Sequence, residues 1–176
     1  MVVTESYDMN CYCHSGINYG NCCKLFIEDG YLPDSVDKLM RSRFTAFCAG
    51  SSEYLKNTWI KEEEPQDLSS EPMNWVHLNV LGFSNKVSNP KPPIPKHLTH
   101  YRGEITEIGS VEFEAILIEK NSYYTHKEKS IFFKLKDKWL YAYGEIDNLN
   151  SGMKKLSMSM LCPCDSGLKV KRCHGK

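Results

Sequence analysis

Two short segments, one near each end of the chain, concentrate residues that can bind a metal ion. Residues 11–23 read CYCHSGINYGNCC and residues 162–174 read CPCDSGLKVKRCH, and the two segments align without a gap. The first segment holds Cys11, Cys13, Cys22 and Cys23, which match Cys162, Cys164, Cys173 and His174 of the second. A repeated pattern of this kind needs one chemical explanation that serves both copies.

Each segment offers four soft or borderline donor atoms, which is the set that structural zinc sites use. A cysteine, one spacer residue and a second cysteine supply half of a tetrahedral cage, and an adjacent pair of donors closes it after eight further residues. The glycines that follow Ser15 and Ser166 let the backbone double back, as a loop that carries its own ligands must do. We therefore predict two zinc ions, one in each segment.

Other interpretations of these cysteines stay open at this point. In a secreted chain the same residues would form a disulfide framework. A redox dithiol usually has two spacer residues and precedes a helix in a strand–helix–strand unit, and the sequence indicates neither feature. A catalytic zinc keeps one position for water, which four protein donors do not leave free. Cys48 stands apart from both segments and is expected to be a small buried apolar residue.

Composition restricts the class of protein. A chain of 176 residues has room for one well-buried core with small appendages. Neither a leader pattern nor a run of eighteen apolar residues occurs, so we expect a cytoplasmic protein without a membrane span. The formal net charge is zero, but residues 153–176 hold six basic residues against Asp165 alone. These basic residues either keep the end of the chain solvated or form a binding surface. A binding surface would suit a protein partner with an acidic face, and a weak contact with RNA phosphate is the alternative.

The first half of the chain indicates helices. Residues 34–48 carry apolar side chains at helical spacing after Pro33, and residues 51–59 form a second helical pattern separated from the first by Gly50. The polar, acidic stretch at 61–72 is interrupted by prolines and is expected to be a loop.

The second half indicates an antiparallel sheet. Residues 75–83, 111–118, 130–136 and 138–146 are rich in β-branched and aromatic residues, and the last two runs meet at Asp137 as a hairpin would. Four prolines between 84 and 110 predict an irregular excursion there, in which 102–108 can form a short extra strand. Helices followed by strands predict an α+β domain with helices packed on one face of a curved sheet.

The two cysteine segments resemble the SEC-C motif, a small zinc-binding unit. The usual motif has a glycine directly after the second cysteine, where this chain has His14 and Asp165. The stretches LMRSRFTAF, YLKNTW, VEFEA and KWLYAYGEI, in that order, resemble the YchJ family of bacterial proteins. The resemblance implies SEC-C units at 1–30 and 153–176 around a cone-like domain at 31–152 similar to nuclear transport factor two.

Two functions follow as expectations. SEC-C units of SecA are associated with binding SecB and other partners, so the resemblance implies a zinc-binding adaptor for a protein partner; the identity of that partner and the oligomeric state stay open. The alternative is an enzyme or small-ligand binder that uses the hollow of the cone. Its candidate residues are Arg41, Arg43, His77 and the pair His126 and Glu128, which we expect at the entry of a strand.

Overall fold

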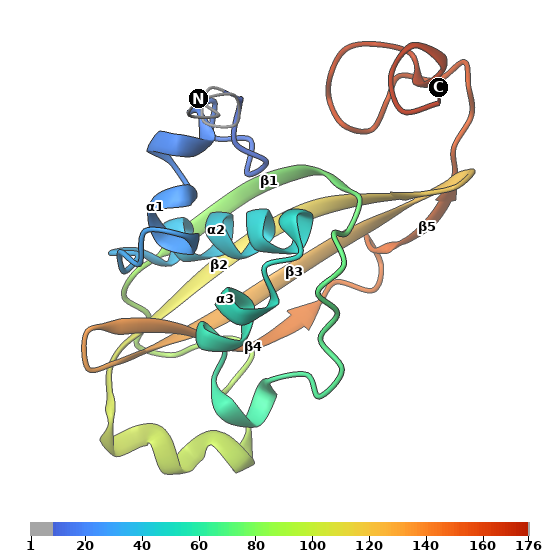
Figure 1. The fold of residues 1–176 in the computed structure, drawn as a ribbon. Helices are drawn as coiled ribbons and strands as arrows, with labels where there is room; N and C mark the ends of the chain where they lie inside the picture. Colours follow the sequence, from blue (N-terminus) through green and yellow to red (C-terminus); the bar gives the residue numbers. More distant parts are fainter. Residues whose placement is uncertain (1–8, 176) are drawn as a thin grey trace, which may run out of the picture.

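One curved antiparallel sheet organises the chain. The structure, a computed structural model, describes residues 9–175. The strands are β1 (Trp75–Ser84), β2 (Ile105–Glu119), β3 (Ser122–Leu135), β4 (Lys138–Ile146) and β5 (Gly152–Lys155). They run as a meander in the order β1-β2-β3-β4, and β5 pairs with the beginning of β3. The α+β class and the curved antiparallel sheet are therefore confirmed (Figure 1).

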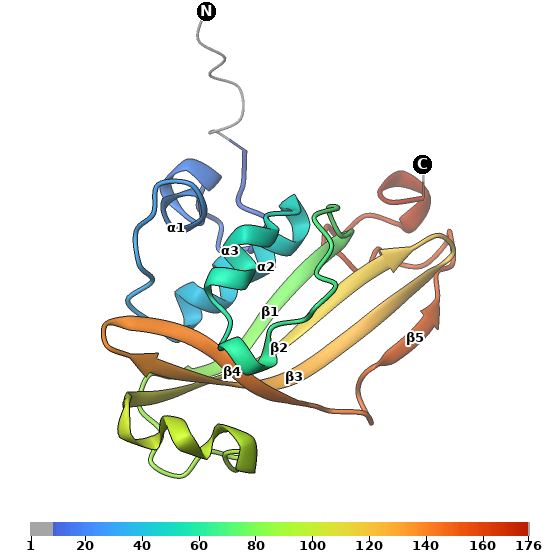
Figure 2. The same ribbon diagram turned by 60° about the horizontal axis from the view of Figure 1, so that its bottom comes forward.

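The sheet bends because its ladders are interrupted. The pairing of β1 with β2 shifts register after Trp75 and again after Val80, and the pairing of β3 with β4 shifts after Ile131. An extra residue on one strand bends that strand and increases its twist. The result is a concave face that carries the helices, as Figure 2 shows.

Among the described residues, three α-helices precede the sheet: α1 (Lys24–Ile27), α2 (Val36–Ala49) and α3 (Ser52–Asn57). The side chain of Ser35 accepts a hydrogen bond from the Lys38 amide and caps the beginning of α2. Gly50 ends α2 with φ of 70°, a left-handed conformation that glycine adopts without steric cost. The helices predicted at 34–48 and 51–59 thus form α2 and α3, whereas α1 was not predicted.

The main core lies between α2 and the concave face of the sheet. Val36, Leu39 and Phe44 of α2 pack with Phe113, Phe132 and Trp139 of the sheet, all of them buried. Burying a side chain of this size contributes roughly 1.5–3 kcal/mol. These contacts place α2 across the sheet. The cysteine segment that precedes α2 packs in turn against this helix.

The proline-rich excursion covers part of the opposite face. It contains the 3-10 helix η3 (Lys96–Gly103), whose Leu98 packs with Ile131, Phe133 and Ala142. The hydroxyl of Tyr143 donates a hydrogen bond to the Pro92 carbonyl oxygen at 3.1 Å. Because η3 covers one face and α2 the other, the run IFF in β3 is buried on both sides.

The strands predicted at 111–118 and 130–136 are both longer in the structure. Residues 105–108 are the beginning of β2 and not a separate strand, since β2 continues through Gly109. A Cβ atom at Gly109 would stand 2.5 Å from Cγ1 of Val36, so close packing of α2 explains that glycine. β3 begins at Ser122 because β2 and β5 pair with its polar first half on either side. His126 and Glu128 therefore lie within a strand, and the expectation of a strand entry was wrong.

No helix among residues 9–175 is long and apolar enough to cross a bilayer. The longest, α2, has 14 residues, whereas a spanning helix needs about 20.

The end of α2 provides a test of this architecture. Gly50→Ala should lower the free energy of unfolding by at least about 2 kcal/mol, because the left-handed conformation alone costs an L-residue roughly 1–2 kcal/mol. The new Cβ would also stand 2.2 Å from the carbonyl oxygen of Ser70. Urea denaturation measures the change. Gly103→Ala is the matched control, since a Cβ there meets nothing within 4 Å; equal losses in the two variants would contradict this account of Gly50.

Candidate metal centres

The first cysteine segment, which precedes α2 in the chain, folds into a small compact loop. Asn10 and Asn18 form an isolated β-bridge, the 3-10 helix η1 (Tyr19–Asn21) follows, and α1 begins directly after Cys23. This path brings together the sulfur atoms of all four predicted ligands, which lie within 4.8 Å of one another. Cys11, Cys13 and Cys23 are buried, and Cys22 is half-buried.

The sulfur separations agree with a tetrahedral metal site. A metal–sulfur bond of about 2.3 Å gives tetrahedral edges of about 3.8 Å, whereas a disulfide would bring two sulfurs to about 2.05 Å. The Sγ atoms of Cys13 and Cys22 are 3.6 Å apart, and those of Cys22 and Cys23 are 3.8 Å apart. All eight cysteines of the chain are free thiols in the structure. The residues present therefore fit a metal ion and do not form a disulfide.

The second segment repeats this local fold. Leu161 and Lys169 form the equivalent β-bridge, and the 3-10 helix η4 (Val170–Arg172) corresponds to η1. The Sγ atoms of Cys164 and Cys173 are 3.5 Å apart, and Nδ1 of His174 lies 3.2 Å from the Cys162 sulfur. These four donors also lie within 4.8 Å of one another. Cysteine and histidine clusters at both ends of the chain can thus each hold a metal ion, the second through Nδ1 of its histidine.

A serine has the same place in both metal-binding segments, here called the first cage (residues 11–23) and the second cage (residues 162–174). The hydroxyl of Ser15 lies 3.3 Å from the Cys22 sulfur and accepts a hydrogen bond from the Ile17 amide. The hydroxyl of Ser166 donates to the Cys173 sulfur at 3.4 Å and accepts from the Leu168 amide. A hydrogen bond to a ligand sulfur fixes the position of that ligand and adjusts its charge. The repeat therefore preserves an outer contact as well as the four donors.

The residue after the second cysteine needs a left-handed backbone. His14 has φ of 57° and Asp165 has φ of 62°, and the glycines two positions further on have φ of 77° and 71°. Histidine and aspartate are among the non-glycine residues that tolerate this region better than β-branched ones. This chain therefore keeps the same turn, although it has His14 and Asp165 where the usual motif has glycine.

Protons are shared unequally within the thiol clusters. Hydrogen bonds from the thiols of Cys13 and Cys23 hold the pKa of Cys11 well below its usual range. The same contact with Cys11 raises the pKa of Cys13 to about 12. At the other end, burial raises the pKa of Cys162 to about 11. A metal ion that binds here displaces the remaining thiol protons, so binding releases protons.

The two cages attach to the body in different ways. The first cage is part of the main core, because Cys11, Cys13 and Cys23 pack in the same cluster as Leu39 and Phe44 of α2. Nη1 of Arg41 also donates to the Cys13 carbonyl oxygen at 3.0 Å. The second cage belongs to a separate cluster in which Cys162 and Val170 pack with Val76, Ile116 and Ile118 at one end of the sheet. Loss of the first cage should therefore disturb the body more.

The cages contact opposite faces of β2: the first packs in one cluster with Phe113 and Ala115, and the second packs with Ile116 and Ile118, which point the other way. The ring centroids of His14 and His77 are 5.0 Å apart, so β1 contacts the tip of the first cage. Burial and the charge of His77 lower the pKa of His14, and the charge of Asp165 opposes them. Asp165 occupies the equivalent position in the second cage, so the tips of the two cages are within electrostatic reach.

The structure separates the five residues proposed for the alternative, ligand-binding function. Arg41 contacts Asp37 and the first cage, and His77 contacts His14. Arg43, His126 and Glu128 line one cavity of about 180 Å³ together with Trp59, Ser130 and Tyr141. The last three were not predicted from the sequence. The alternation of His126, Glu128 and Ser130 along one strand places these side chains on one face and could have indicated Ser130.

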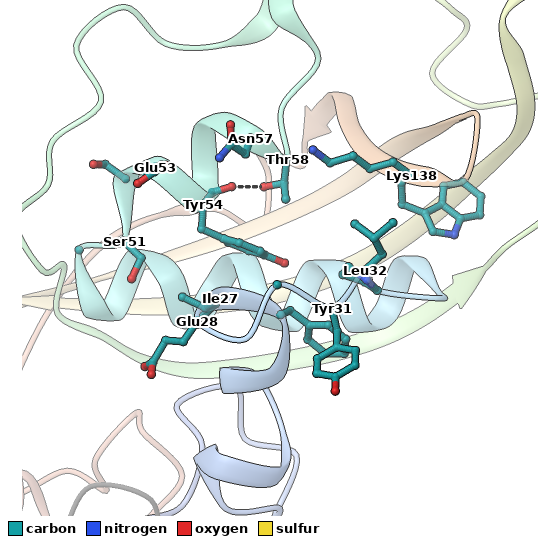
Figure 3. Close-up of a pocket in the computed structure, with 16 residues that line it drawn as sticks. Ile27, Glu28, Tyr31, Leu32, Ser51, Glu53, Tyr54, Asn57, Thr58 and Lys138 are labelled. Atoms are coloured by element: carbon teal, nitrogen blue, oxygen red, sulfur yellow. Dashed lines mark hydrogen bonds between the residues drawn. The ribbon is translucent and has the colours of Figure 1, made fainter. Parts of the chain in front are cut away.

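A larger hollow lies beside the first cage. It has a volume of about 610 Å³, and Figure 3 shows residues of the 26–33 segment facing α3 across it. Tyr31 and Leu32 on its wall are exposed to solvent. Because residues 26–33, which follow the first cage, form one wall, the shape of this hollow depends on the cage.

Comparison with known proteins agrees with this architecture. A family model described as "YchJ, middle NTF2-like domain" matches residues 35–144. A UPF0225 protein of Corynebacterium glutamicum is 31% identical over 138 residues, which are 78% of this chain and 97% of that protein. A UPF0225 protein of Haemophilus influenzae strain PittEE is 27% identical over 179 residues and covers 98% of this chain and 96% of its own length.

Two solved structures have the same fold. The solution structure of a SEC-C motif containing protein from Rhodopseudomonas palustris has a TM-score of 0.62 and 28% sequence identity, covering 78% of this chain and 98% of its own. The crystal structure of a SEC-C motif containing protein from Psychrobacter arcticus has a TM-score of 0.58 and 22% identity, covering 97% of both chains. The second likeness concerns the fold alone.

The left-handed turn of the second cage gives a direct test. Asp165→Val should weaken metal binding at this cage by about 5- to 30-fold, because a β-branched residue pays roughly 1–2 kcal/mol in this conformation. Asp165→Gly should bind metal at least as tightly as the natural chain. Competition with a chromophoric chelator measures both affinities. Equal affinities of the valine and glycine variants would show that the turn conformation does not control the cage.

Proposed function

This chain belongs to the YchJ family with a middle NTF2-like domain, and we propose that it is a zinc-binding adaptor that holds a protein partner through its two SEC-C units. The observation that carries the proposal is the repeated cage. Two segments at opposite ends of the sequence fold alike and gather four donors each, and their tips lie within electrostatic reach of each other.

The donor sets support zinc. Thiolate and imidazole ligands in a tetrahedron suit zinc, whereas carboxylate-rich octahedral sites suit magnesium, calcium and manganese. One cage offers four sulfurs and the other three sulfurs and a nitrogen. Iron and copper(I) also bind thiolates, so the identity of the metal is an outcome of the elemental analysis described below.

A structural role follows from the number of donors. When four protein side chains fill a tetrahedral zinc site, no position remains for water, and the ion cannot generate a hydroxide nucleophile. The ions would then hold the backbone of each unit in one shape. Structural zinc ions supply roughly 10–16 kcal/mol of apparent binding free energy in small zinc-finger units. Units shaped in this way can present rigid surfaces to a partner.

Both units expose an apolar residue at the same position of the repeat. Ile17 is 49% exposed and Leu168 is 44% exposed, and each follows the left-handed glycine. Lys169, Lys171 and Arg172, which follow Leu168 in the chain, are exposed and positively charged. An apolar contact within a basic rim suits a protein with an acidic face, and the rim sets the rate and specificity of docking.

We place this function in the cytoplasm. Its reducing conditions keep thiols free to bind metal, and the chain has eight cysteines that are all unpaired in the structure.

The first test measures metal and stability together. The natural chain should carry two zinc ions, and Cys22→Ser and Cys173→Ser should each carry one. Cys22→Ser should also lower the free energy of unfolding by about 3 kcal/mol or more, because its cage is part of the main core. Cys173→Ser should leave the main unfolding transition within about 1 kcal/mol of the natural value.

Both replaced cysteines are half-buried, so the two variants form a matched pair. Elemental analysis by mass spectrometry and urea denaturation supply the measurements. Less than one metal ion per chain in reduced protein would overturn the metal sites. A different metal at full occupancy would overturn zinc and keep the structural role.

The second test addresses the partner. Metal-loaded, full-length protein should capture a protein from a lysate of its source organism. The double variant Ile17→Asp, Leu168→Asp should lose at least about 90% of it, since a charge buried in an apolar contact costs several kcal/mol. Leu149→Asp is the control, because Leu149 is 95% exposed and lies outside both units.

Three results would count against the adaptor. Equal capture by the natural chain and the double variant would place the contact elsewhere. Loss of capture after nuclease treatment would show that RNA, and not a protein surface, is recognised. A partner retained by metal-free protein would separate binding from the cages.

A further inference from the structure

A cavity inside the cone domain is separate from both cages. It has a volume of about 180 Å³ and lies between α2, the residues after α3, and strands β1 to β4. Its walls are mostly aromatic: Phe44, Phe47, Trp59, Trp75, Phe113 and Tyr141. An engineered apolar cavity of about 150 Å³ holds benzene, so this cavity has room for a single ring. Phe47, Trp59 and Trp75 are only partly buried, which leaves the cavity open to solvent on that side.

Arg43 places a positive charge in the wall of this cavity. Its side chain is only 3% exposed, and its guanidinium carbon lies 4.1 Å from the centroid of the Trp59 ring. Burial lowers the pKa of Arg43 to about 10, so it stays protonated at neutral pH. A buried charge is usually paired because its desolvation is costly. Within residues 9–175, however, no acidic side chain forms an ion pair with Arg43.

The hydrogen bonds of Arg43 use one nitrogen. Nη1 donates to the Leu55 carbonyl oxygen at 3.1 Å and to the Thr58 hydroxyl at 2.8 Å. These bonds hold the guanidinium in place. Nε and Nη2 have no hydrogen-bond acceptor among the described residues. The cation is thus fixed by the protein while part of its donor capacity remains for another molecule.

Glu128 lies in the same cavity but its oxygens are already occupied. Oε1 accepts from the hydroxyls of Ser130 at 2.6 Å and Tyr141 at 3.0 Å, and Oε2 lies 2.9 Å from Nε2 of His126. Burial opposes ionisation, but these three contacts hold the pKa of Glu128 below its usual range. The charge of Glu128 opposes the effect of burial on the pKa of Arg43, but its oxygens are taken up by these three contacts. The unused N–H groups of Arg43 are therefore the donors that the cavity leaves for a ligand.

A second donor in the cavity lacks a partner. Nε1 of Trp59 is buried and has no hydrogen bond. The other buried side-chain nitrogens without a partner among the described residues belong to His77 and Trp139, which do not line this cavity. An indole N–H can only donate. Arg43 and Trp59 are neighbours, and each has an N–H group that lacks an acceptor oxygen.

We propose that this cavity binds a small organic monocarboxylate with a body of about one ring. The ring packs among the aromatic side chains, and the carboxylate accepts hydrogen bonds from Arg43 and from the indole of Trp59. No zinc ligand lines this site, although Phe44 and Phe113 belong both to its wall and to the core cluster of the first cage. It assigns to the middle domain a ligand class that follows from an aromatic wall, a fixed cation and an unpaired indole.

Benzoate is the probe for the test. Titration of full-length, metal-loaded protein labelled with ¹⁵N should shift the indole N–H resonance of Trp59 more than those of Trp75 and Trp139. This readout requires no substitution and therefore does not depend on how a variant folds. Toluene, which matches the ring but has no acceptor, should bind at least 10-fold more weakly. Benzamide tests whether the negative charge is needed, and it too should bind more weakly than benzoate.

A pair of variants tests the donor. Trp59→Phe should weaken benzoate binding by roughly 10- to 150-fold in calorimetry, as expected for the loss of a hydrogen bond to a charged group. Trp75→Phe removes similar ring area from the same cavity and should weaken binding less than Trp59→Phe. Absence of benzoate binding at millimolar concentrations would overturn the proposal. Equal binding of toluene and benzoate, or equal effects of the two substitutions, would overturn the carboxylate recognition.

Discussion

Convergence of four donor atoms is the constraint on which the ends of this protein depend. Within thirteen residues, each cage must bring its donors within 4.8 Å of one another. Four thiolates at this spacing would repel one another, and a cation that replaces the thiol protons removes this repulsion. The left-handed turn at His14 and Asp165, the serine contact and the short 3-10 helix all serve that convergence, and all three occur in both copies.

The body of the protein uses this constraint in two ways. At the first cage, three buried cysteines join the core of α2, so the metal site and the helix that crosses the sheet support each other. At the second cage, Val170 and Leu156 fasten the unit to the end of the sheet through a smaller apolar cluster. The curved sheet thereby holds both units and keeps its own cavity on the concave face. No metal ligand lines the cavity, so the cages and the cavity can each have a function of its own.

Much of this organisation could be predicted from residue patterns. The repeat of Cys11 to Cys23 in Cys162 to His174 indicated both cages, and the order of helical and alternating patterns indicated an α+β domain. The limits of the strands could not be predicted in the same way. Glycine is typical of turns, but Gly109 lies within β2, where α2 packs directly against it. Ser122 to Glu128 are polar and joined β3 only because strands flank them on both sides. The cavity depended on such tertiary neighbours too, since Trp59 and Tyr141 are far from Arg43 in sequence.

Protein side chains alone should complete both metal sites, which X-ray absorption at the zinc edge of the doubly loaded, full-length protein can show. Four sulfurs at one cage and three sulfurs with one nitrogen at the other average to 3.5 sulfurs and 0.5 nitrogen per zinc. We expect this shell, with zinc–sulfur distances of about 2.3 Å and four-coordinate zinc. A shell with fewer than three sulfurs per zinc, completed by oxygen from exchangeable water, would contradict it.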